Sequence, residues 1–103
     1  MNSTVLEQAR NFISLVQSSG TIVSTASIYG SYARGQANSH SDIDICVVSP
    51  EFGKDYISEM VKLRNISVNI NPKIEPIPLN PADLEDKYSS LISEINKHQY
   101  KIV

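Results

Sequence analysis

The chain has 103 residues with a formal net charge of −2, and 41% of its residues are apolar. This length suits a single domain with one core, so residues 1–103 are treated as one domain. The slightly acidic balance argues against a dedicated nucleic-acid-binding protein, which usually carries a strong basic excess. A single cysteine and the lack of any leader-like or membrane-length apolar run predict a soluble cytoplasmic protein.

The N-terminal half of the chain is predicted to form one helix and two strands. Apolar residues recur at helical spacing over residues 5–16, and Asn2 or Ser3 can cap this helix. The β-branched stretch 21–29 predicts a strand that ends at a glycine. Residues 43–48 predict a second strand, and the two strands are joined by a short helical turn and a polar loop.

The C-terminal half is predicted to form a helix over 54–64, an extended segment over 73–79, a further helix and a short last strand over 100–103. The inner side of the helix over 54–64 is expected to carry Tyr56, Ile57, Met60, Val61 and Leu63. Pro76 and Pro78 remove two hydrogen-bond donors from the same side of the extended segment, which is therefore predicted to be an edge strand.

Asn80 and Pro81 form a typical helix start, and one apolar stripe with a jog near Lys87 is expected to follow. The stripe comprises Leu84, Tyr88, Leu91, Ile92 and Ile95. The complete order of elements predicts an α/β or α+β fold, in which helices pack on a small mixed β-sheet.

The most informative motif is Gly30-Ser31 followed, after ten residues, by Asp42-Ile43-Asp44 at the start of an apolar strand. Residues i and i+2 of a strand share a face, so Asp42 and Asp44 should present two carboxylates side by side while Ile43 points to the core. Adjacent like charges call for a cation, and Mg²⁺ takes its hard oxygen ligands from carboxylates and phosphates. The Gly-Ser turn offers backbone N–H groups and a hydroxyl that suit a phosphate.

This motif resembles the signature of the polymerase-beta-type nucleotidyltransferase superfamily, and it covers about fifteen residues, from Gly30 to Asp44. The short chain is similar to the minimal nucleotidyltransferase (MNT) members, the antitoxin half of HEPN/MNT pairs. The resemblance implies a polymerase-beta-like nucleotidyltransferase fold. It also implies ATP as substrate and two Mg²⁺ ions as cofactors.

The resemblance further implies a third acidic residue on a neighbouring strand, and Glu75 is the only acid in the predicted third strand. Asp42, Asp44 and Glu75 are then the expected catalytic and metal-binding residues, with Glu75 as a further candidate for the general base. Gly30, Ser31 and Arg34 are the expected nucleotide-binding residues. Each also has an ordinary structural interpretation, in which Glu75 is a solvated edge-strand charge and Arg34 a solvated loop residue.

The function implied is Mg²⁺-dependent transfer of AMP, or another NMP, from a nucleoside triphosphate to a hydroxyl. By resemblance, the acceptor is a tyrosine of a separate HEPN-type protein, as in a toxin–antitoxin system that works by AMPylation. A domain of this length would otherwise need self-association to supply acceptor recognition. Two alternatives stay open: a non-catalytic subunit that binds nucleotide or partner and acts by contact, and a transferase for small molecules such as aminoglycosides.

Overall fold

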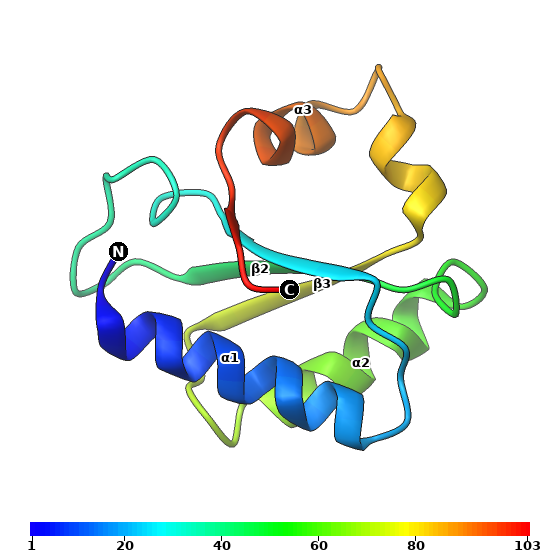
Figure 1. Ribbon diagram of the computed structural model, residues 1–103, viewed down its shortest axis with the longest axis horizontal. Helices are drawn as coiled ribbons and strands as arrows, with labels where there is room; N and C mark the ends of the chain where they lie inside the picture. Colours follow the sequence, from blue (N-terminus) through cyan, green and yellow to red (C-terminus); the bar gives the residue numbers. More distant parts are fainter.

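The computed structural model describes residues 1–103 and contains one four-stranded mixed sheet (Figure 1). The strands are β1 (Thr25–Tyr29), β2 (Ile43–Val48), β3 (Ile74–Leu79) and β4 (Tyr100–Lys101), and they lie in the order β3-β2-β1-β4. β1 is antiparallel to both β2 and β4, whereas β2 and β3 are parallel. The predicted α+β class with a small mixed sheet is confirmed, and so is the short last strand.

Helices cover both faces of this sheet (Figure 1). α1 (Ser3–Ser18) and α2 (Tyr56–Ser67) pack against one face, whereas the 3-10 helix η1 (Pro81–Glu85) and α3 (Ser90–Lys97) lie over the other. The larger core cluster of 13 buried residues lies on the face of α1 and α2. A smaller cluster of 6 buried residues lies beneath α3. No helix has both the length and the apolar character needed to cross a membrane.

The first helix forms as predicted from the sequence, because its N-cap residue and its apolar stripe both favour the same helix. The Asn2 side chain accepts hydrogen bonds from the backbone N–H groups of Thr4 at 2.8 Å and Val5 at 3.4 Å, as the predicted N-cap. The first strand is shorter than predicted and begins at Thr25. Upstream, the N–H of Ile22 donates to the Glu51 carboxylate at 2.7 Å, which holds this segment as a loop.

β2 alternates between the two faces of the sheet as predicted. Ile43, Ile45 and Val47 belong to the core cluster under α1 and α2. Cys46 and Val48 lie on the other face, in the smaller cluster. Asp44 shares that second face by strand parity and stands near the start of β2, opposite Tyr29 of the smaller cluster.

β3 is an edge strand, as its two prolines predicted. The N–H of Ile43 donates to the Lys73 carbonyl at 2.8 Å and the N–H of Ser49 to the Leu79 carbonyl at 2.9 Å, which turns the odd-numbered residues of β3 toward β2. The backbone nitrogens of Pro76 and Pro78 therefore face the outer edge of the sheet, while both side chains are buried. The outer edge lacks donors at these two positions, which disfavours pairing with a further strand.

The prediction of which residues of α2 face the core was wrong for most of the set. Leu63 and Ser67 are buried, with Ile66 and Ile70 partly buried beside them, whereas Ile57 is 75% exposed. Tyr56 and Val61 are likewise exposed, and only Leu63 and the half-buried Met60 of the predicted set lie inward. Leu63, Ile66 and Ser67 have the spacing i, i+3 and i+4, so the packed part of the helix is its C-terminal half, and Ile70 follows in the turn after the helix.

The predicted last helix is two separate elements, with the break at the expected jog. η1 ends at Glu85, and Ser89 caps a new helix by accepting a hydrogen bond from the Ile92 N–H at 3.2 Å. Ile92 and Ile95 are buried as predicted. Tyr88 was wrongly assigned to the stripe: it lies in the connection between the two elements and is 98% exposed.

Candidate functional site

The turn after β1 brings the chain close to the carboxylate of Asp44. Tyr29 is the register partner of Asp44, and Gly30 follows it with φ at +69°. A Cβ at Gly30 would overlap Oδ2 of Asp44 and lie 3.2 Å from its Cγ. Gly30 is therefore required both for its left-handed backbone and for the space that the Asp44 carboxylate occupies.

The turn itself presents three consecutive free amide groups. The predicted helical turn is present, since the N–H groups of Arg34 and Gln36 donate to the carbonyls of Gly30 at 3.0 Å and Ser31 at 2.9 Å. The backbone N–H groups of Ser31, Tyr32 and Ala33, in contrast, have no acceptor within the chain, and neither does the Ser31 hydroxyl. Successive unpaired N–H groups of this kind form an anion-binding concavity.

Asp44 lies against this turn, and the two other predicted carboxylates, Asp42 and Glu75, lie near enough to Asp44 to act on its charge. Asp44 is half-buried and directly opposite Glu75 in the parallel pair of β2 and β3, and Asp42 is exposed two residues before it. Burial raises the pKa of Asp44 most, and the negative charges of Asp42 and Glu75 raise it further. The positive charge of Arg34 acts in the opposite direction. All four predicted charged residues thus act on a single region.

The donor set suits a hard divalent cation, because carboxylate oxygens are the ligands that Mg²⁺ takes from proteins. A cation beside Asp44 would also relieve the like-charge repulsion that raises its pKa. The three carboxylates are not gathered tightly enough to form a ready metal-binding cluster. Neither Asp42 nor Asp44 forms an ion pair, so these two carboxylates remain available to a cation, whereas Glu75 is paired with an arginine.

Glu75 is held by a residue that the sequence did not indicate. The guanidinium of Arg64, on α2, donates to both carboxylate oxygens of Glu75, at 3.3 Å from Nη1 to Oε1 and 2.7 Å from Nη2 to Oε2. No local signal in the sequence could have found this pair, because it depends on where α2 lies relative to the edge of β3.

Arg34 is also engaged. Its guanidinium forms an ion pair with Glu94 of α3, and its Nε donates to the side chain of Gln36 at 3.2 Å. Arg34 lies near enough to Asp44 to act on its charge, but its guanidinium is paired with an acidic residue of the helix that covers the same face. A phosphate group would compete with Glu94 for it.

Tyr29 and Cys46 complete the buried lining beside Asp44. Burial, followed by the nearby charge of Asp44, raises the pKa of the Tyr29 hydroxyl far above its usual range. Burial also raises the pKa of the Cys46 thiol, which is 2% exposed. Both side chains are neutral at physiological pH, and Cys46 is a small core residue, as expected.

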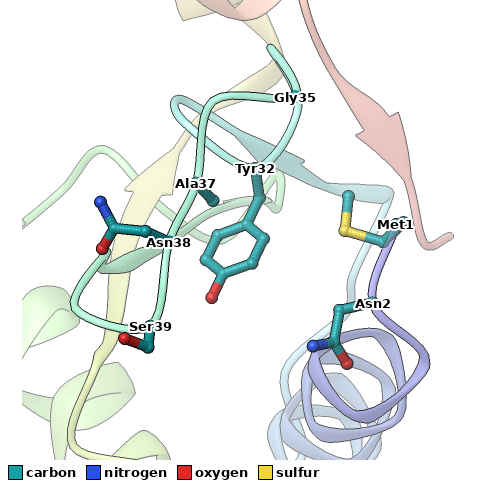
Figure 2. A pocket seen from close by; sticks show the side chains of 7 residues that line it. All are labelled: Met1, Asn2, Tyr32, Gly35, Ala37, Asn38 and Ser39. Carbon is teal, nitrogen blue, oxygen red and sulfur yellow. The ribbon is translucent and has the colours of Figure 1, made fainter.

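The largest cavity of the fold, about 440 Å³, lies beside this turn and contains none of the carboxylates. Figure 2 shows Tyr32 with its hydroxyl directed into the space between the 35–39 loop and the start of α1, where Met1 and Asn2 form the opposite wall. No charged side chain lines it. The cavity is thus separate from the charged face of Asp44.

Comparison with known proteins agrees with this geometry. A family model described as "Nucleotidyltransferase domain" matches residues 9–102. No curated protein matches the sequence. One similar solved structure is of a protein from Sulfolobus solfataricus that is described as a nucleotidyltransferase by inference. Its sequence is 26% identical to this chain, and the TM-score is 0.62. The match covers 77% of this chain and 69% of that one.

A second solved chain, from a toxin–antitoxin complex with AMP-PNP, has the same fold at 16% identity, with a TM-score of 0.58 over 91% of this chain and 72% of that one. The family match spans both the Gly-Ser turn and the strand that carries Asp42 and Asp44. The chain belongs to the nucleotidyltransferase domain family.

Proposed function

We propose that this domain transfers a nucleoside monophosphate, AMP in the first instance, from a nucleoside triphosphate to a hydroxyl group in a Mg²⁺-dependent reaction. One observation carries the proposal: three consecutive unpaired backbone N–H groups, at Ser31, Tyr32 and Ala33, directly follow Gly30, which lies against the carboxylate of Asp44. A triphosphate needs donors for its oxygens, and the cation that accompanies it needs carboxylates. Both stand together at this turn.

The residues of the site divide into two groups by their chemistry. The amide groups of the turn and the Ser31 hydroxyl bind the β- and γ-phosphates, which fixes the α-phosphorus for in-line attack. Asp42 and Asp44 hold the divalent cation, with a second ion completing the site. When bound, the metal supplies charge neutralisation at the transferring and leaving phosphates. Glu75 accepts the proton of the attacking hydroxyl or joins the metal ligands.

The acceptor proposed is a tyrosine of a separate HEPN-type partner chain, which makes the domain an antitoxin-like protein adenylyltransferase. The choice rests on the resemblance of the motif to the minimal nucleotidyltransferases. The chain from a toxin–antitoxin complex that shares this fold is in keeping with it. In this proposal the partner chain, or a second copy of this chain, provides the surface that recognises the acceptor hydroxyl.

A contact-only antitoxin is the second candidate, and one observation favours it. Arg64 engages both oxygens of Glu75, the residue expected to complete catalysis. Such a subunit would bind ATP·Mg²⁺ and its partner without forming a phosphodiester.

The two candidates are separated by incubating the domain and its partner with ATP labelled either at the α- or at the γ-phosphate. Adenylyl transfer predicts stable label on the partner from the α-position alone, with Mg²⁺ and not with EDTA. Label from the γ-position would indicate phosphoryl transfer instead. Absence of label from both, with the partner still neutralised, would favour action by contact.

A further inference from the structure

The ion pair between Arg64 and Glu75 crosses the edge of the sheet. Glu75 shares its face with Ile77 and Leu79, which pack in the cluster beneath α3. Arg64 belongs to α2, on the opposite face, and reaches around the unpaired edge of β3 to Glu75. Both side chains are partly exposed, 45% for Arg64 and 39% for Glu75.

The backbone already places Glu75 where it could join the two aspartates. It is the direct register partner of Asp44 on a neighbouring strand, so both side chains leave the same face of the sheet about 5 Å apart. Yet no three-carboxylate cluster exists in the structure. Both oxygens of Glu75 are bound by the fork of the guanidinium, in the bidentate geometry that specifies direction as well as charge.

We propose that Arg64 is a positioning residue for Glu75: it holds this carboxylate away from Asp42 and Asp44 until cationic charge at the site outcompetes the guanidinium. This inference rests on the proposed metal-dependent function. It divides the site into a permanent cation position at the aspartates and a second, weaker position that forms only when Glu75 leaves Arg64. Arg64 thereby sets the affinity of the second position and touches neither substrate nor metal.

The ion pair between Arg64 and Glu75 is weak enough for a bound cation to displace Arg64. A partly exposed ion pair changes an equilibrium by about fivefold at most, because water and salt screen it. A divalent cation between three carboxylates offers Glu75 a stronger partner than one shared guanidinium. The exchange needs only a side-chain rotation of Glu75, since its backbone is already in register with Asp44.

Mn²⁺ titration of the nucleotide-free protein, followed by electron paramagnetic resonance, tests the proposal without relying on activity. We expect two classes of Mn²⁺ site in the wild type, the tighter of which is lost in Asp44→Asn. Arg64→Gln should tighten the weaker class by about threefold to fivefold. Arg10→Gln is the matched control, because this exposed arginine on α1 has no ion-pair partner, and it should leave both classes unchanged.

Two further variants separate the effect of the bidentate contact between Arg64 and Glu75 from the effect of the positive charge of Arg64 alone. Arg64→Lys keeps the charge and loses the bidentate geometry, so it should tighten the weaker site as well. In a Glu75→Gln background, Arg64→Gln should have no effect, because the residue that it positions no longer ligates. Thermal unfolding of each variant confirms that the fold is retained.

The proposal is overturned if Arg64→Gln leaves Mn²⁺ binding unchanged or weakens it. It is equally overturned if Arg64→Lys behaves as the wild type, or if the gain persists when Glu75 is Gln. These outcomes leave the proposed function standing as long as Asp44→Asn abolishes the tighter site. A wild-type protein that binds no Mn²⁺, with or without ATP, would overturn the proposed function itself.

Discussion

Replacing Gly30 by Ala is predicted to destabilise the domain and to displace Asp44, for two separable reasons. The first is backbone strain, because φ at Gly30 is +69° and an L-residue in the left-handed region costs about 1–2 kcal/mol. The second is steric, because the new Cβ would overlap the Asp44 carboxylate and lie 3.2 Å from its Cγ. Overpacking of this kind adds about 1–3 kcal/mol.

Gly35→Ala is the matched control that separates these contributions. Gly35 has nearly the same backbone angle, φ at +71°, but nothing lies within 4 Å of a Cβ built on it. Its substitution should therefore cost only the strain, and Gly30→Ala should exceed it by about 1–3 kcal/mol. In a domain of this size, that difference corresponds to a melting temperature lower by roughly 4–20 °C.

Urea unfolding of both variants measures the difference, and calorimetry with ATP·Mg²⁺ measures its effect on the site. Gly30→Ala should bind ATP·Mg²⁺ far more weakly than Gly35→Ala, since only the former moves a proposed cation ligand. Adding Asp44→Ala to Gly30→Ala should recover the steric part of the lost stability and none of the strain. Equal destabilisation by the two glycine substitutions would refute the close approach of Gly30 and Asp44.

Three further outcomes follow from the same site. Asp44→Asn should raise the free energy of unfolding of the metal-free protein at pH 7–8 by about 0.5–1 kcal/mol, since it removes a charge that is disfavoured by burial and by the like charges of Asp42 and Glu75. Because the pKa of Asp44 is raised in the folded state, this gain should disappear below about pH 4, where the carboxylate is protonated in both states; thermal unfolding against pH would show it. Ser31→Ala should weaken ATP·Mg²⁺ binding by roughly 1.5–3 kcal/mol in calorimetry, with the amides retained; unchanged affinity would remove the hydroxyl from the phosphate site. Glu75→Gln should slow single-turnover transfer at least tenfold with little change in ATP·Mg²⁺ affinity; an unchanged rate would leave Glu75 only its ion pair with Arg64 and remove it from the catalytic site.

The sequence predicted those parts of the fold that depend on local chemistry. The alternation of Asp42, Ile43 and Asp44 determines which face carries the carboxylates. Two prolines whose backbone nitrogens face the outer edge of β3 identify the edge strand. Tyr88 lay in an apolar stripe by spacing alone, but the capping chemistry of Ser89 ends that stripe and begins a new helix.

Interactions between elements that are distant in the chain could not be predicted from the sequence. The apolar spacing of α2 extends from Tyr56 to Ile66, and only the position of the sheet decides that Leu63 packs while Ile57 faces water. The partners of Glu75 and Arg34 are an arginine on α2 and a glutamate on α3, each selected by the approach of a helix to the sheet. The motif predicts which residues belong to the site, whereas tertiary packing decides which of them are free.

The central claim is that the turn at Ser31 and the carboxylate of Asp44 form one site for nucleotidyl transfer. Single-turnover transfer of α-labelled AMP to the partner, compared between wild type and Asp44→Asn with Mg²⁺, tests it most directly. The substitution is isosteric and removes one charge from the cation site, so the rate should fall by about two orders of magnitude or more while the fold is kept. Transfer by Asp44→Asn at close to the wild-type rate would contradict the claim.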